Sequence, residues 1–159
     1  FLELGYSDEI GILSIDIDGN DYWIWKEINT INPIVVIVEY NSLYGCEKAY
    51  TTPYKPDFFR LNRDNIILNY GASLLSLCDL AEGKGYDFIG CNNAGNNAYF
   101  IRKDKNNFFK KLNAEEGYVV SKFNEMTEPD GTRIVGRERF LKIKGREIFN
   151  TRKNTIETI

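Results

Sequence analysis

The sequence contains no histidine, few cysteines and no long apolar run, and each shortage narrows what the protein can do. Because histidine is the commonest general base and metal ligand, any chemistry must use carboxylates, amides, hydroxyls, lysine or a bound cofactor. The three cysteines, Cys46, Cys78 and Cys91, are odd in number and lack CxxC spacing, which favours reduced thiols in a cytoplasmic protein. No apolar run approaches the roughly 18 residues of a membrane span, so we expect no membrane partner.

Composition and charge indicate a globular protein with an uneven charge distribution. Of the 159 residues, 43% are hydrophobic and 27% charged, which suits a domain with a real core. Residues 1–132 carry 12 basic and 20 acidic side chains, whereas residues 133–153 carry 8 basic and 2 acidic ones. The basic segment is either an anion or nucleic-acid contact, or a solvated element packed on an acidic body. We favour the second interpretation, because no nucleic-acid motif accompanies the charge.

The first part of the chain predicts a strand–helix–strand unit. The stretch "IGILSIDI" (10–17) is β-branched and too short for a helix, so it predicts a buried strand. A helix is expected within "GNDYWIWKEINTI" (19–31), whose apolar residues lie on one face. The next stretch, "PIVVIVEYN" (33–41), has five consecutive β-branched residues, which is typical of a parallel sheet covered by helices. We therefore expect 10–17 and 33–40 to be parallel neighbours.

The second part predicts a helix and a reversed pair of strands. A long, tyrosine-rich connection (42–72) precedes them, and connections of this length are usually functional or locally structured. Ser73 can cap a helix over "SLLSLCDLAEGKG". The stretches "YDFIGC" (86–91) and "NAYFIRK" (97–103) are joined by the short turn "NNAGN". So short a turn forces the two strands to be antiparallel.

The stretch "DIDGND" places Asp16, Asp18 and Asp21 within six residues. A calcium loop of the EF-hand type is one alternative, but it requires glycine where Asp21 stands and a helix before the loop. Here a predicted strand comes before it. Three carboxylates this close also need solvent, a cation or hydrogen-bond donors to stabilise them. We therefore favour an edge of the predicted sheet over a calcium loop.

Acidic and amide side chains end both predicted parallel strands. Asp16 and Asp18 share one side of the first strand, and Glu39 and Asn41 share one side of the second. The carboxyl ends of parallel strands are where open α/β sheets bind ligands. Such a cluster suits Mg²⁺ or Ca²⁺, ribose hydroxyls, or a substrate hydroxyl that awaits deprotonation. The alternative is that these side chains only cap helix termini and stay hydrated.

Three stretches together resemble one enzyme family: "LSIDIDGNDYWIWKEI", "PIVVIVEYN" and "YGASLLSLCDLAEGKGYDFIGCNNAGNNAYFIRKD". They look like the later half of class I S-adenosylmethionine-dependent methyltransferases, and more narrowly like the FkbM-type enzymes encoded among glycan-biosynthesis genes. The likeness covers about residues 10–104, and "DGTRIVGRERF" resembles the segment after the domain in such proteins. Many FkbM-type sequences have Glu where Asp18 stands.

The resemblance implies an α/β fold, a Rossmann-like methyltransferase half-sheet that is mostly parallel and ends in an antiparallel strand pair. Residues 1–104 would form this half of the domain, and residues 105–159 a C-terminal extension. The implied activity is methyl transfer from S-adenosylmethionine to a hydroxyl of a small molecule or glycan, with Asp16 and Asp18 orienting or deprotonating the acceptor. Tyr44, Tyr50 and Tyr54 are expected either to wall the acceptor site or simply to pack in the protein.

The resemblance also implies a metal site with one departure from the family pattern. In metal-dependent O-methyltransferases Mg²⁺ lies between an Asp ending one strand and an Asp-Asn pair ending the next. By likeness Asp16 (or Asp18), Glu39 and Asn41 would hold Mg²⁺ here, but Tyr40 separates Glu39 from Asn41.

A larger departure is that the glycine-rich turn and the acid that bind the cofactor in this family are absent from the sequence. We therefore expect a fragment, in which the missing N-terminal half or a second chain covers the edge of strand 10–17. The competing hypothesis is a non-catalytic module that binds a carbohydrate or a protein partner at the sheet edge.

Overall fold

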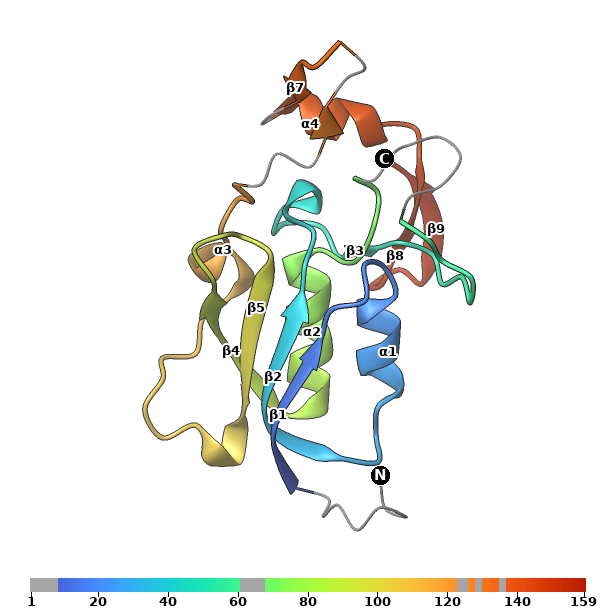
Figure 1. Ribbon diagram of the computed structural model, residues 1–159. Coiled ribbons are helices and arrows are strands. Elements are labelled where there is room, and N and C mark those ends of the chain that lie inside the picture. The colour runs from blue at the N-terminus through green and yellow to red at the C-terminus, as the bar shows by residue number, and fades with distance from the viewer. Residues whose placement is uncertain (1–8, 61–67, 123–125, 128–129, 135–136) are drawn as a thin grey trace.

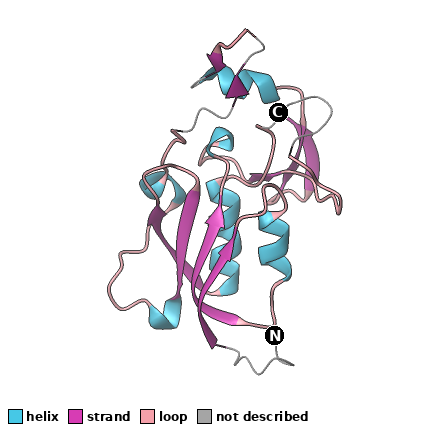
Figure 2. Ribbon diagram, viewed as in Figure 1, coloured by secondary structure: helices cyan, strands magenta, loops and turns pink. Residues whose placement is uncertain are grey.

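A computed structural model shows a mixed α/β protein (Figures 1 and 2). The structure describes residues 9–60, 68–122, 126–127, 130–134 and 137–159. Residues 61–67 of the predicted long connection lie outside this set, as do residues 135–136 of the basic segment.

A four-stranded sheet forms the centre of the protein, in the order β1-β2-β5-β4 (Figure 1). Its strands are β1 (Glu9–Ile15), β2 (Asn32–Glu39), β4 (Tyr86–Cys91) and β5 (Asn97–Arg102). The parallel pairing of β1 with β2 and the antiparallel pairing of β4 with β5 are both confirmed. Because a strand precedes the aspartate turn, the EF-hand alternative is wrong.

The expectation of a mostly parallel sheet is also wrong for the described strands. Only the β1/β2 pairing is parallel, whereas β2/β5 and β4/β5 are antiparallel. The short turn reverses β5 relative to β4, and β5 then lies between β4 and β2. As a result β4 runs in the same direction as β2 without being hydrogen-bonded to it.

Two helices, α1 (Asp21–Glu27) and α2 (Leu74–Lys84), pack on the sheet. The predicted boundaries of α2 are confirmed. The Ser73 side chain accepts a hydrogen bond from the N–H of Ser76, and Gly85 ends the helix with a left-handed φ of 84°. Glycine takes this conformation without the steric cost that other residues meet.

Aromatic and β-branched side chains fill the space between these helices and the sheet. Val36 and Val38 are fully buried in β2, which explains their β-branched run. The Trp25 ring of α1 lies 4.9 Å from Phe100 and 6.1 Å from Tyr86, measured between ring centroids. Because aromatic side chains bury a large apolar area each, these contacts dominate the stability of the core.

The C-terminal region folds back onto the connection that follows β2. The strand β3 (Tyr50–Thr51) pairs with β8 (Glu147–Asn150), which pairs with β9 (Thr155–Thr158). Residues from both sides of the predicted boundary at 104 therefore share one small sheet. The division into two parts at that boundary stays a prediction.

The remaining elements are short. They are the 3₁₀ helices η2 (Ser42–Tyr44) and η3 (Lys103–Lys105), the helices α3 (Ala114–Gly117) and α4 (Arg137–Ile143), and the strand pair β6 (Met126–Thr127) and β7 (Arg133–Ile134).

Within the basic segment, the Arg152 guanidinium forms an ion pair with the Asp79 carboxylate at 2.6 Å. This agrees with the interpretation that the basic segment packs against acidic elements. None of the described helices has the length and apolar character needed to cross a bilayer.

Replacing a core aromatic should cost far more stability than the same change on the surface. Phe100→Ala removes a fully buried ring and should lower the free energy of unfolding by about 3–5 kcal/mol. The matched control is Phe108→Ala, whose side chain is 92% exposed and should change stability by less than about 0.5 kcal/mol. Urea unfolding followed by circular dichroism compares the two. Equal losses would mean that Phe100 is not in the core.

Candidate active site

A buried carboxylate holds the turn between β1 and α1. Asp21 is 0% exposed, and its two oxygens accept hydrogen bonds from the N–H groups of Ile17 at 3.0 Å and Gly19 at 2.9 Å. Burial raises the pKa of Asp21, and these N–H bonds act in the opposite direction. The third aspartate of the predicted cluster therefore stabilises the turn and is not available to a ligand.

The loop after β3 packs on this turn. Thr52 Oγ1 donates to the carbonyl of Gly19 at 3.1 Å, and the indole N–H of Trp23 donates to the carbonyl of Thr52 at 2.9 Å. The Phe58 ring lies so close to Gly19 that a Cβ there would be 2.2 Å from the ring carbons. A side chain at this position would push the Phe58 ring away from the turn.

Asp16 directly follows β1, and Glu39 is the last residue of the neighbouring parallel strand β2. The register pairs Ile15 with Val38, so the next residues, Asp16 and Glu39, are neighbours on one face. Asp16 is exposed, whereas Glu39 is only 7% exposed. The predicted convergence of these two carboxylates is therefore seen in the structure.

Glu39 is the unusual titratable group of this site. Burial, followed by the charges of Asp16 and Asp21, raises the pKa of Glu39 to about 8, and Arg60 acts in the opposite direction. Within the described residues the buried oxygen Oε2 of Glu39 has no hydrogen-bond partner. A carboxyl group buried with an unbonded oxygen is costly for folding, and such groups are often functional.

Asp18 has a different environment from Asp16. Its backbone is left-handed, with a φ of 59°, which aspartate tolerates better than most residues. The Asp18 carboxylate forms an ion pair with Arg60, whose guanidinium lies 3.7 Å from the centroid of the Tyr70 ring. No sequence signal pointed to Arg60, because only the folded connection brings it back to the turn.

Asn41 has a structural position. Its amide group donates to the carbonyls of Leu68 at 2.8 Å and Tyr70 at 2.9 Å, and its oxygen accepts from the N–H of Leu43 at 3.0 Å. Asn41 thus holds two loops together, and these bonds do not support its predicted role as a metal ligand. Across the part of the chain that the structure describes, no three side chains of His, Cys, Asp or Glu are grouped so as to hold a metal ion.

The structure separates the three tyrosines that were expected to wall one site. Tyr44 is buried and Tyr50 partly buried, and both line a cavity formed with the C-terminal region. Tyr54 is 56% exposed and lies beside Trp23, with 6.2 Å between the ring centroids. Of the three, Tyr54 is therefore the one close to the aspartate turn.

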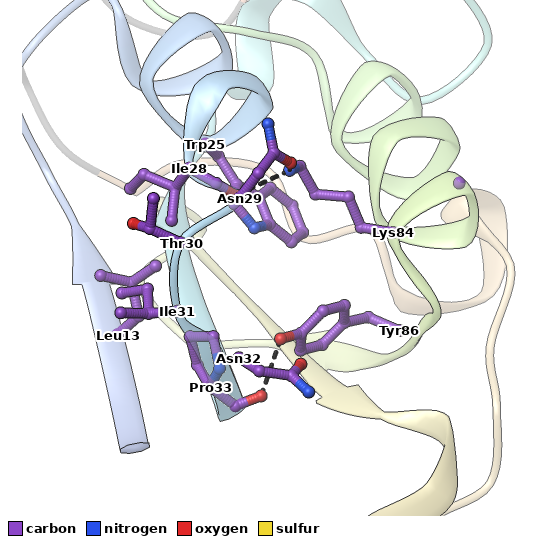
Figure 3. A pocket seen from close by; sticks show the side chains of 11 residues that line it. Leu13, Trp25, Ile28, Asn29, Thr30, Ile31, Asn32, Pro33, Lys84 and Tyr86 are labelled. Atoms are coloured by element: carbon purple, nitrogen blue, oxygen red, sulfur yellow. Dashed lines mark hydrogen bonds between the residues drawn. The ribbon is translucent and has the colours of Figure 1, made fainter. Parts of the chain in front are cut away.

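Another cavity, of about 530 Å³, lies where β2 begins (Figure 3). In Figure 3 the Lys84 ammonium group donates to the Ile28 carbonyl and the Asn29 side chain, both at 2.9 Å. The Tyr86 hydroxyl donates to the Pro33 carbonyl at 2.7 Å. The lining of this cavity contains no carboxylate among the described residues, and the ammonium and hydroxyl groups are bonded to the protein, so we assign no chemistry to it.

No protein-family model matches this sequence, and comparison with curated proteins and with solved structures found no significant match. The function must therefore be inferred from the geometry of the site.

Glu39 should make the stability of the protein depend on pH. Its pKa of about 8 in the folded protein lies above the ordinary 4.5, so folding takes up a proton between these values. The stability that Glu39 contributes is fully present below pH 4.5 and is lost as the pH rises through 8. Glu39→Gln, which stays neutral, should match the parent protein at pH 4 and exceed it at pH 9 by up to a few kcal/mol, at about 1.4 kcal/mol per pKa unit.

Urea unfolding of both proteins at the two pH values measures this difference. Other groups titrate in both proteins, so their contributions cancel. A constant difference between the two proteins across this range would mean that Glu39 has an ordinary pKa.

Proposed function

We propose that this chain is the later half of an S-adenosylmethionine-dependent O-methyltransferase and that Glu39 accepts the proton of an acceptor hydroxyl on a sugar. The observation that supports the proposal is the buried Glu39 carboxyl group, whose Oε2 has no hydrogen-bond partner among the residues that the structure describes, at the carboxyl end of β2 beside Asp16. This is the edge of an α/β sheet at which ligands usually bind.

The chemistry requires alignment of the acceptor and removal of one proton. When bound, S-adenosylmethionine supplies an already reactive methyl group. The Glu39 carboxylate would take the proton from the acceptor hydroxyl, and a carboxylate with a pKa of about 8 is a stronger base than an ordinary one. Asp16, which is exposed next to Glu39, would accept a hydrogen bond from the acceptor.

Mg²⁺ does not fit these residues. The Asn41 oxygen already accepts a backbone N–H, and Asp18 is paired with Arg60. We therefore propose that the carboxylates act without a metal.

The proposal also requires a partner for β1. This strand lies at one end of the described sheet, and its Ile12 side chain is 63% exposed. An apolar edge strand is a liability unless another strand or a loop covers it. A strand from the missing cofactor-binding half of the domain, or from a second chain, would pair with β1.

A second candidate function is a non-catalytic module that binds a carbohydrate or a protein. It is favoured by the exposed rings of Tyr54 and Phe59, which are 56% and 69% exposed in the loop that packs on the aspartate turn. Contiguous exposed apolar surface often marks a binding site. Glycan binding by the full gene product in the absence of any methyl transfer would favour this module.

Glu39→Gln should abolish most methyl transfer in the full product of the gene. The substitution keeps the size of the side chain but removes the base, so kcat should fall by about two to four orders of magnitude. In the parent protein kcat should rise with pH through about 8, and this rise should disappear in the variant. The measurement is transfer of a radiolabelled methyl group to sugar acceptors.

The matched control is Glu115→Gln, an exposed glutamate on α3 that lies outside the site. It should keep full activity and the same pH profile. If Glu39→Gln retains activity while Asp16→Asn loses it, the base is Asp16 and our assignment is wrong.

The 159-residue chain by itself should bind S-adenosylmethionine weakly, because its sequence has no glycine-rich turn after a strand. Titration calorimetry should show a dissociation constant weaker than micromolar. Micromolar binding, worth about −8 kcal/mol, would place a complete cofactor site within this chain.

A further inference from the structure

A cavity of about 410 Å³ lies between the connection after β2 and the C-terminal region. Four separate segments surround it, and it is lined chiefly by Tyr44, Cys46, Tyr50, Tyr118, Phe140 and Ile159. None of the carboxylates at the ends of β1 and β2 contributes to this lining. Its size and its largely aromatic walls are typical of cavities that bind small molecules.

The hydroxyls of the three tyrosines that line the cavity are already bonded within the protein. Each hydroxyl has a partner within the protein: Tyr44 with Asn69 Oδ1 at 2.9 Å, Tyr50 with Glu157 Oε2 at 3.1 Å, and Tyr118 with the Ser42 carbonyl at 2.5 Å. A ligand therefore meets aromatic faces and edges, which bind other flat rings by offset or edge-to-face contacts.

The walls of the cavity are held in place by a second hydrophobic core. Tyr44 belongs to a buried cluster with Leu68, Ile143 and Ile148, and Tyr50 and Ile159 pack against that cluster. The Ile159 N–H also donates to the Arg146 carbonyl at 3.0 Å. Because the walls are already ordered, a ligand would lose little free energy in arranging them.

Charges of both signs flank the mouth of the cavity. Lys48 lies with its ammonium group 5.5 Å from the centroid of the Tyr50 ring, and Glu47 is next to it in the chain. Both side chains are exposed. Since the two charges offset each other, the mouth favours neither an anion nor a cation.

We propose that this cavity binds a small, uncharged, planar ring compound of one or two fused rings. The lining supplies aromatic contacts, and the ligand needs no polar group to pair with the tyrosine hydroxyls because these are already bonded within the protein. The opposite charges of Glu47 and Lys48 at the mouth offset each other. The site does not depend on the proposed methyl transfer, because neither Glu39 nor Asp16, which carry that chemistry, lines it.

Cys46 provides a built-in reporter of binding, with indole as the probe. Iodoacetamide alkylation of each cysteine is followed by mass spectrometry, with and without indole. A bound ring should shield the Cys46 thiol, and at about nine times its dissociation constant indole should slow alkylation roughly tenfold. Cys78 and Cys91 do not line the cavity, so their rates should not change.

Two variants of neighbouring α4 residues test the location. Phe140→Ala removes an aromatic wall and should weaken the protection of Cys46, measured as a higher indole concentration for half-protection. Leu141→Ala is the control, because Leu141 is 57% exposed and does not line the cavity; it should leave protection unchanged.

The proposal is overturned if indole does not slow Cys46 alkylation in the parent protein, or if it slows all three cysteines equally. Equal protection in Phe140→Ala and the parent would also overturn it. If Phe140→Ala does not fold, as judged by circular dichroism, the comparison of the three cysteines in the parent protein still decides the question.

Discussion

The carboxylate of Asp21 receives two backbone N–H groups, and the geometry of the whole site depends on these bonds. Without them, the buried N–H group of Gly19 would lose its partner, and an unpaired buried donor costs about 1–3 kcal/mol. The bonds fix the direction in which the chain leaves β1. They thereby set the positions of Asp16 and Asp18 relative to Glu39 on the neighbouring strand.

This fixed turn also positions segments that are distant in the sequence. Its glycine provides the flat surface on which Phe58 packs, and its carbonyl accepts the Thr52 hydroxyl. The same loop begins with β3, which pairs with β8 near the C-terminal end of the chain. The small sheet, the tyrosine-lined cavity and the turn are therefore connected through one loop, although they come from separate parts of the sequence.

Four neighbouring acidic residues differ in their burial and in their bonding partners, and these differences give them different roles. Asp21 is buried but receives hydrogen bonds, Asp18 is paired with Arg60, and Asp16 is exposed to solvent. Glu39 is buried and keeps one oxygen without a partner in the described residues. Its raised pKa follows from this environment, because the loss of solvent and the nearby negative charges both disfavour its ionised form. Residues of the same chemical type thus take structural and candidate chemical roles according to their burial and their partners.

The sequence by itself determined the local helices, strands and turns, and which side chains share one face of a strand. The β-branched run of β2, the Ser73 cap of α2 and the short turn between β4 and β5 each specify backbone geometry within a few residues, so their outcomes were predictable. The alternation of side chains along β1 and β2 likewise predicted that Asp16 and Glu39 would meet. Only the tertiary structure decided that β5 lies beside β2 and that Asp18 forms an ion pair with Arg60. It also decided that Asn41 holds two loops together and that Tyr54 lies apart from Tyr44. These features depend on contacts between residues far apart in the chain, and no periodicity or spacing in a single sequence encodes which distant segments will pack together.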